Sequence, residues 1–477
     1  MKTTTLILTV AAGLMVLGTA CKKENKVQQQ GDFRALNAGP TPLSPCTDTL
    51  GPVILSGKIS TNTTLNSNTL YYLDGVVAVE GATLTIQPGT IIRGLAGTPA
   101  SGGNPGTPGG VLVITKTGFI DAQGTASCPI VFTSYRERSG IPAPGDWGGI
   151  VILGEAPTNR STSSVVEGIP NNLAGGVTYD NTYGGSSTGD NSGILTHVRI
   201  EYAGWELAVD NELNGLTLGG VGNGTVIRNV EVFKSNDDGF EFFGGTVNAS
   251  HLVSIDALDD ALDFDNGYVG TIDTALVVVD PARADKSQSN GIESDNNAAG
   301  DSTATPITKP VLSHITLVGV SSAAAASITN GAPSGTGRYG RSAHIRRSSQ
   351  TTLSKSIFIG FNNGIVFDQT PIISNSYNAY NNGQTVLTSV LSNAFVRPYA
   401  QEVSGVFTPL TTPSGNLGYT AAQSLNVRLV NPFVRPSEFG GAANYFPQAS
   451  SPANSPVDAG AFVFGGTDWT GSWVRFQ

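Results

Sequence analysis

The sequence predicts an all-β chain that folds as a right-handed parallel β-helix with rungs of about 22 residues. Residues 229–268 give the same pattern twice: a short apolar strand, an acidic turn and a second strand that ends in Gly. Asp237 and Asp238 recur as Asp259 and Asp260, a spacing of 22 residues (259 − 237). Apolar and polar residues alternate in these strands, and no helical spacing accompanies them. A period in the twenties with two short strands per copy is typical of one turn of a parallel β-solenoid.

The same register extends in both directions along the chain. Side chains alternate across a strand, so residues of one parity in the second strand of each rung should point inward. These residues are Leu216, Leu218, Phe240, Phe242, Leu262, Phe264, Ile292, Ile365 and Phe367. We therefore expect Phe240 to lie directly over Leu262, and Phe242 over Phe264, in a continuous apolar interior.

The N-terminus predicts an exported protein. A charged residue precedes an apolar run (6–17) that is too short to span a bilayer, and residues 1–20 fit a secretory signal peptide. Gly18-Thr19-Ala20-Cys21 resembles the processing site of bacterial lipoproteins, although that site usually has Leu where this chain has Gly18. The resemblance implies cleavage before Cys21, lipidation of Cys21 and anchoring to the outer membrane. An ordinary secreted protein with an unmodified Cys21 is the alternative.

Four segments are expected after the signal peptide. Residues 21–50 are polar and carry prolines, as a lipid-anchored flexible tether would. Residues 51–192 alternate strands with long loops, as expected for the N-terminal part of the β-helix, and Thr158–Ser192 is a polar insertion expected to add few core residues. Residues 193–369 hold the regular β-helix, and residues 370–477 lose its period. Because a solenoid has to close its open end against further stacking, we expect this last segment to be a β-rich cap.

Two cysteines remain once Cys21 is set aside. In an oxidising exported setting Cys46 and Cys128 can form a disulfide, which would tie the end of the tether to the first strands. Two free thiols are the alternative. The four histidines are dispersed, and no close Cys/His spacing indicates a zinc site.

Asn and Asp recur at one position of each rung, two residues before the first inward residue of the second strand. The position is occupied by Asn214, Asp238, Asp260, Asn290 and Asn363. Asn and Asp side chains bond to nearby backbone groups and tolerate left-handed backbone conformations. We therefore interpret this column as a structural turn ladder that can also bond to the next rung.

A second column, which is acidic, has the outward parity. It consists of Glu241, Asp263 and Glu293, and Asp265 and Asp295 follow two residues later in their strands. Adjacent rungs lie about 4.8 Å apart, where two unit charges repel by about 3 kcal/mol at an effective dielectric of 20. A bound cation, a raised pKa or hydration would relieve this repulsion. Because oxygen-only carboxylate sets suit Ca²⁺, these five residues are the candidate calcium ligands, and a solvated acidic face is the alternative.

The charge of the chain excludes one class of partner. There are 26 Lys and Arg against 36 Asp and Glu, and half of the acidic residues lie between Glu201 and Asp295. Nucleic acid is therefore not expected as a partner.

Several motifs together resemble one group of proteins. DWGGIVILGEAP (146–157), DNELNGLTLGGVG (210–222), SNDDGFEFFGGTVN (235–248) and TDWTGSW (467–473) are similar to motifs of β-helix lipoproteins and secreted surface proteins common in Bacteroidetes. The resemblance covers most of residues 51–477 and implies a β-helix at the cell surface, anchored in the outer membrane. The expected role is binding or scaffolding at the envelope, with a glycan or another surface protein as partner.

Catalysis is the rival interpretation, as a polysaccharide lyase or glycoside hydrolase acting in an acidic lateral groove. Asp237-Asp238-Gly239 resembles the paired-Asp motif of polygalacturonases, but the Gly-His-Gly and Arg-Ile-Lys motifs of that family are missing from the chain. Lyases of this fold need a basic residue beside bound calcium, and the nearby basic residues are Arg283, Lys286, Arg338, Arg341, Arg346 and Arg347. The sequence leaves the choice open and favours binding, because fold analogy carries most of the enzyme interpretation.

Overall fold

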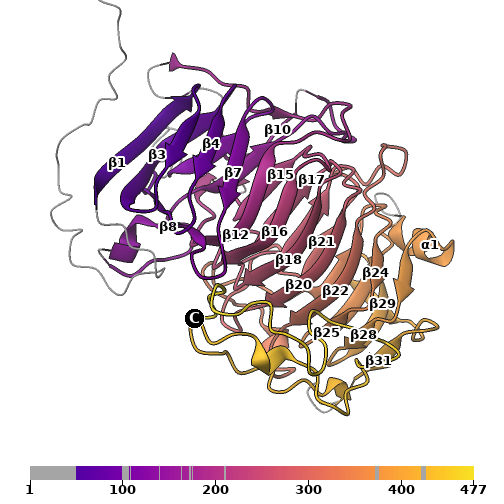
Figure 1. The fold of residues 1–477 in the computed structure, drawn as a ribbon. Helices are drawn as coiled ribbons and strands as arrows, with labels where there is room; N and C mark the ends of the chain where they lie inside the picture. The colour runs from indigo at the N-terminus through magenta and orange to yellow at the C-terminus, as the bar shows by residue number, and fades with distance from the viewer. Residues whose placement is uncertain are drawn as a thin grey trace, which may run out of the picture.

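The computed structural model describes residues 50–477 with short gaps, and these residues form a parallel β-helix (Figure 1). The gaps are residues 99–106, 108, 139, 163, 171–172, 174–175, 209–210, 371–374 and 421–425. The signal peptide, Cys21 and Cys46 lie outside the described residues. Rungs stack along one axis from indigo β1 to orange β31 in Figure 1, so the predicted fold class is confirmed.

Each rung contributes strands to three faces of the helix. Short strands on the first face are β2 (Thr63–Leu65), β4 (Thr83–Ile86), β7 (Phe119–Gln123), β24 (Thr352–Ser354) and β27 (Val386–Thr388). Short strands on the second face are β5 (Ile91–Gly94), β8 (Ile130–Ser134), β25 (Ile357–Ile359), β28 (Leu391–Asn393) and β31 (Leu417–Tyr419). Each of them pairs in parallel with the strand of a neighbouring rung.

Longer strands in the middle of the helix turn the corner between the first and second faces. They are β12 (Gly193–Glu201), β16 (Val226–Phe233), β18 (Asn248–Ile255), β20 (Thr271–Val278) and β22 (Val311–Val318). Each contains one residue with positive φ at the same place in the register: His197 (47°), Asn229 (53°), His251 (56°), Thr274 (69°) and His314 (55°). Asn and His adopt this conformation more readily than most side chains. Each strand therefore bends at this residue while its pairing with the neighbouring rungs continues.

The third face carries the repeated second strand of each rung. Its strands are β6 (Val111–Ile114), β9 (Gly149–Leu153), β15 (Leu216–Gly219), β17 (Phe240–Phe243), β19 (Leu262–Asp265), β21 (Ile292–Ser294), β23 (Arg341–Ile345), β26 (Asn363–Asp368) and β29 (Arg397–Val403). At the N-terminal end, β1 (Leu50–Ile59) pairs along β3 (Thr69–Val79), which reaches both the second and third faces.

A few elements lie outside this scheme. Antiparallel pairs form between β10 (Ser164–Val165) and β11 (Thr182–Tyr183), between β13 (Glu206–Ala208) and β14 (Asn211–Glu212), and between β29 and β30 (Val406–Pro409). The short α-helix α1 (Ser376–Asn381) and the 3-10 turns at Tyr135–Arg138, Ala325–Ser327 and Ala443–Tyr445 complete the described elements. Within the described residues, no helix has the length and apolar character needed to cross a membrane.

The interior of the helix is a continuous apolar stack. Phe240 pairs with Leu262 and Phe242 with Phe264 in the β17–β19 register, as predicted, and all four side chains are buried. Tyr268 packs against Phe242 at 4.8 Å between ring centroids, and its hydroxyl donates a hydrogen bond to the carbonyl of Val247. Because each rung repeats the same inward parity, side chains of neighbouring rungs stack throughout the interior.

The last part of the chain differs from the expected cap. Parallel strands continue past residue 369 as far as β31, and residues 426–477 then lie along the outer side of the second face (yellow in Figure 1). Apolar side chains of this C-terminal segment, among them Leu429, Tyr445 and Phe476, form one buried cluster with outward residues of β16, β18 and β20. The segment therefore covers an apolar lateral face of the helix.

The third face is covered at its N-terminal half by the insertion after β9. Val166, Ile169, Leu173 and Tyr183 form a buried apolar cluster with outward residues of β6 and β9. The expectation that Thr158–Ser192 adds few core residues is therefore wrong, because several of its scattered apolar residues meet one strand face. This covering lies next to the acidic residues of the third face.

Candidate functional site

The outward acidic column stands on consecutive strands of the third face. Glu241 of β17 pairs with Asp263 of β19, which pairs with Glu293 of β21. The same outward row holds Thr217 on the rung before Glu241 and His344 on the rung after Glu293. The predicted register therefore brings the three carboxylates together, and the row runs from a threonine through three carboxylates to a histidine along the helix axis.

Most of the column is buried, unlike the solvated acidic face that was the alternative. Glu241 is 6 % exposed and Glu293 8 % exposed, while Asp263 is partly exposed. Outward parity says only that a side chain leaves the helix interior, and other segments of this chain cover the outer side. These carboxylates are therefore separated from most of the water that would screen their repulsion.

The turn ladder joins successive rungs through side-chain oxygens. Asn214 accepts a hydrogen bond from the backbone N–H of Asp238 (3.2 Å), and Asp238 from that of Asp260 (2.8 Å). Asp260 accepts from the N–H of Asn290 (2.6 Å), and Asn290 from that of Arg341 (2.9 Å). Arg341, which the sequence pattern missed, thus occupies the next ladder position.

Asn363 continues the ladder one rung further on. It pairs with Arg341 in the β23–β26 register, and its side-chain oxygen accepts a hydrogen bond of 3.1 Å from the Arg397 guanidinium. The ladder position is therefore filled by arginine as well as by Asn and Asp, which is why a search for Asn and Asp alone skips rungs.

The ladder and the column together form three overlapping groups of carboxylates. Within each group the ligand atoms all lie within 4.8 Å of one another. We call them set 1 (Asp237, Asp238, Asp259), set 2 (Asp238, Glu241, Asp263) and set 3 (Asp260, Asp263, Glu293). Asp238 belongs to sets 1 and 2, and Asp263 to sets 2 and 3, so the groups follow one another across three rungs.

Three of the five predicted ligands belong to these sets, and two do not. Glu241, Asp263 and Glu293 are members, whereas Asp265 and Asp295 lie outside all three sets. Asp265 accepts a hydrogen bond of 2.5 Å from the N–H of Asn266, and Asp295 is held by arginines. The sequence pattern assigned Asp238 and Asp260 to the turn ladder alone and did not single out Asp237 or Asp259 as ligands, because these residues lie in turns and not in the outward row.

Burial and mutual repulsion act on these carboxyl groups in the same direction. The pKa of Asp263 is raised well above its usual range by burial first and then by the charges of Glu293 and Asp295. The pKa of Glu241 is likewise raised well above its usual range, by burial and then by Asp263. Burial, followed by the charge of Asp295, raises the pKa of Asp265 to about 7. Each group gains if its charge is balanced by a proton or by a cation.

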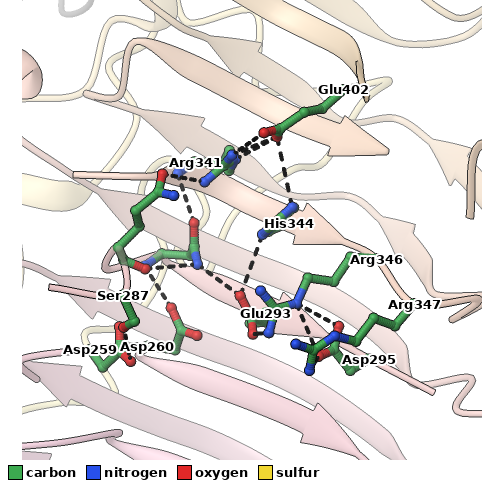
Figure 2. A network of polar contacts seen from close by, with 12 residues as sticks. Asp259, Asp260, Ser287, Glu293, Asp295, Arg341, His344, Arg346, Arg347 and Glu402 are labelled. Carbon is green, nitrogen blue, oxygen red and sulfur yellow. Dashed lines mark hydrogen bonds and ion pairs between the residues drawn. The ribbon is translucent and has the colours of Figure 1, made fainter. Parts of the chain in front are cut away.

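Among the described residues, the ion pairs of the column lie at its C-terminal end. Arg346 pairs with Glu293 (2.5 Å) and with Asp295 (2.8 Å), and Arg347 with Asp295 (2.8 Å). Figure 2 shows both guanidinium groups around Asp295, beside Glu293. Arg346 and Arg347, whose distance from the column the sequence could not indicate, thus neutralise its last rung.

His344 and Glu402 extend this polar network to the next rungs (Figure 2). Arg341 binds the Glu402 carboxylate through Nε (3.0 Å) and Nη2 (2.5 Å). His344 lies between the carboxylates, 3.4 Å from Glu293 and 3.8 Å from Glu402. Burial and the charges of Arg341 and Arg346 hold the pKa of His344 well below its usual range, so its ring is neutral. Glu402 and His344 had no distinguishing signal in the sequence, because they lie outside the acidic repeat.

The donor chemistry of the sets fits calcium. All the ligand atoms are carboxylate oxygens, as hard divalent cations prefer. Asp259 Oδ1 and Asp263 Oδ1 are buried and have no hydrogen-bond partner, so each is free to coordinate a cation. Among the described residues, no ion pair reaches Asp237, Asp238, Glu241, Asp259, Asp260 or Asp263.

Of the three cysteines, the structure describes Cys128 alone. Cys128 precedes β8 and is disulfide-bonded. Because Cys46 lies outside the described residues, its pairing with Cys128 stays a prediction, as does the lipidation of Cys21.

The chain is similar to one known protein family. A family model for a pectate-lyase-like β-helix domain matches residues 57–417, from β1 to the start of β31. Comparison with curated proteins and with solved structures finds no match. The matched region includes all three carboxylate sets, and the C-terminal segment 426–477 lies outside it.

Proposed function

Because the chain belongs to the pectate-lyase-like β-helix family, we propose that it is a calcium-stabilised β-helix of the cell envelope that binds a glycan or a surface protein. The run of three carboxylate sets across β17, β19 and β21 carries the proposal. Calcium bound there would balance charges that the described residues leave unbalanced, and would join neighbouring rungs. Asp238, Glu241 and Asp263 of set 2 would hold it at the centre of the run.

Binding is favoured over catalysis by the surroundings of the carboxylates. Glu241 and Glu293 are buried, and Arg346, which pairs with Glu293, is also paired with Asp295. A lyase would need a free base, and a glycosidase two accessible carboxyl groups, facing a bound polysaccharide. Buried and paired groups suit a structural cation better than a substrate.

An exposed stripe on the first face supports a binding role. At one position of the register, β-branched or short polar side chains recur on successive strands: Ile194, Val226, Asn248, Thr271, Val311, Thr352 and Val386. We call these residues the lateral stripe. Val226, Val311 and Val386 are 43 %, 38 % and 41 % exposed, which is unusual for a row of apolar side chains. A flat, uncharged row of this kind suits the apolar side of a sugar chain or a protein partner.

The envelope location in the proposal rests on residues 1–21. Their signal-peptide pattern and the Cys21 context favour a lipid anchor, and residues 21–50 would serve as the tether. The β-helix would then be held at the membrane by its N-terminal end, with its lateral faces open to partners.

The test is a screen of acidic and neutral polysaccharides for retention and for cleavage, with calcium or with chelator, together with cross-linking on intact cells. We expect retention of a polysaccharide, or one cross-linked surface protein, without cleavage. Val311→Lys should abolish this binding, and Val53→Lys, which changes a valine of similar exposure (41 %) on β1 outside the stripe, should not. Cleavage of any polysaccharide would assign the chain to the enzymes instead, and a lack of both retention and cross-linking would reject the binding role.

A further inference from the structure

The third carboxylate set differs from the other two because an arginine of the chain already binds it. Arg346 Nη2 lies 2.5 Å from Glu293 Oε1, and Arg346 Nε lies 2.8 and 3.0 Å from the two Asp295 oxygens. In Figure 2 the Arg346 side chain reaches Glu293 and Asp295 together. The positive charge of Arg346 therefore lies at the C-terminal end of the three sets. It is paired with Glu293, which a cation in set 3 would need as a ligand.

The other two sets accept hydrogen bonds from neutral side chains. Glu241 accepts a short hydrogen bond from the Asn214 side chain, and Asp259 accepts one of 2.8 Å from the Ser287 hydroxyl. Among the described residues, no Lys or Arg lies within ion-pair distance of any member of sets 1 and 2. The charge of these sets is therefore left for a bound cation to balance.

A buried imidazole lies beside set 3. His344 is 5 % exposed, neither of its ring nitrogens has a hydrogen-bond partner, and its Nδ1 lies 3.4 Å from Glu293 Oε2. Calcium prefers oxygen ligands and commonly keeps bound water, so a water molecule on a cation held by Glu293 would give this nitrogen a hydrogen-bond partner. This orphaned nitrogen points to set 3 as a ligand position independently of the carboxylates.

The geometry of Arg346 explains how one side chain can take the place of a cation in set 3. Its guanidinium is planar and permanently charged, and it binds two carboxylates at once through a fixed fork of N–H donors. A tethered guanidinium balances Glu293 without entering the coordination of Asp263.

We propose that Arg346 is an internal counter-ion that takes the place of a divalent cation in set 3. The native chain then binds cations through sets 1 and 2, and removal of the guanidinium opens one more cation position, formed by Asp260, Asp263 and Glu293. This inference rests on the proposed calcium-binding function and specifies that set 3 is closed to metal in the native chain.

The test counts bound calcium in Arg346→Gln and in a matched control. Arg347→Gln removes the neighbouring guanidinium, which pairs with Asp295. Equilibrium dialysis with calcium, followed by elemental analysis, gives the number of ions per chain in the native protein and in both variants. We expect Arg346→Gln to bind one more ion than the native protein, and Arg347→Gln to bind the native number.

The possible outcomes separate this inference from the proposed function. An unchanged ion count in Arg346→Gln, with calcium bound by the native protein, overturns the counter-ion role and leaves the proposed function intact. A native protein that binds no calcium overturns the proposed function. If Arg346→Gln unfolds in chelator, recovery of the folded state in calcium supports the inference, because the cation replaces the lost charge. Failure to fold at any calcium concentration overturns it.

Discussion

Phe242 and Phe264 stack on each other in the interior of the helix, with ring centroids 5.0 Å apart and ring planes inclined by 23°. They occupy the same place on consecutive rungs, and both are fully buried. The contact shows how this fold is stabilised. Each rung contributes one layer to a continuous apolar column, so a defect in one layer is felt by both of its neighbours.

Phe242→Ala should destabilise the protein by about 3–5 kcal/mol, because it removes a ring that packs on both Phe264 and Tyr268 and leaves a cavity. Denaturant unfolding followed by circular dichroism measures the loss. Phe464→Ala, at a phenylalanine that is 57 % exposed, is the control and should change the free energy of unfolding by less than about 0.5 kcal/mol. Equal effects of the two changes would refute the stacked interior.

Calcium should raise the melting temperature, because a ligand that binds only the folded state stabilises it by mass action, by about 2.7 kcal/mol at a hundredfold excess over its dissociation constant. Asp263→Asn should reduce this response, since Asp263 belongs to both set 2 and set 3. In chelator the same change should be neutral or stabilising, because it also removes repulsion. Thermal scans in calcium and in sodium at matched ionic strength provide the measurement. Coincident melting curves in the two salts would rule out the cation.

Without calcium, stability should fall as the pH rises from about 4 to about 7. The pKa of Asp265 is raised from 3.8 to about 7, and the pKa values of Glu241 and Asp263 are raised well above their usual ranges. The folded state therefore binds protons more tightly than the unfolded state. The stabilisation that these bound protons provide is complete below the pKa of the group in the unfolded chain. It is lost as the pH rises through the pKa of the group in the folded protein. Each proton contributes a slope of up to about 1.4 kcal/mol per pH unit.

Saturating calcium should flatten this pH dependence above pH 5, because the cation takes the place of the protons. Unfolding titrations at several pH values, with calcium or with chelator, measure both slopes. A stability that rises with pH in chelator would contradict the raised pKa values.

Arg475→Ala should release the C-terminal segment 426–477. Arg475 pairs with Glu201 (2.9 Å), which is fully buried, and its backbone N–H donates to both oxygens of the Glu231 carboxylate. Removing one partner of a buried pair costs about 3–5 kcal/mol. Limited proteolysis should then cleave within residues 426–477 before the β-helix is attacked. Arg228→Ala, at an exposed arginine on the first face, should leave both stability and cleavage unchanged.

Cys21→Ser should move the protein from the membrane fraction to the soluble fraction, because serine at this position cannot be lipidated. Labelled fatty acid should enter the native protein and not the variant. If the native protein takes up no label and the variant still sediments with the outer membrane, the hypothesis of a lipid anchor at Cys21 is wrong.

The sequence by itself determined the rungs, the inward layers and the register of the acidic column. Asp237 and Asp259 repeat at a spacing of 22 residues, and Phe240 and Leu262 share a parity, so their stacking follows from local alternation and period alone. Glu241 lies beside Asp263 for the same reason. A repeat of this kind needs no knowledge of distant contacts, because each rung rests only on its neighbours.

Only the tertiary structure decided which outward side chains meet water and which charges meet each other. Glu241 is buried although its parity is outward, and Arg346 comes from a rung reached only after a long insertion. Arg475 reaches Glu201 across 274 residues of chain. Periodicity describes the path of the backbone around the helix. The lengths of insertions, and the face on which the last segment lies, depend on packing between segments that are far apart in the sequence, and these contacts leave no periodic signal.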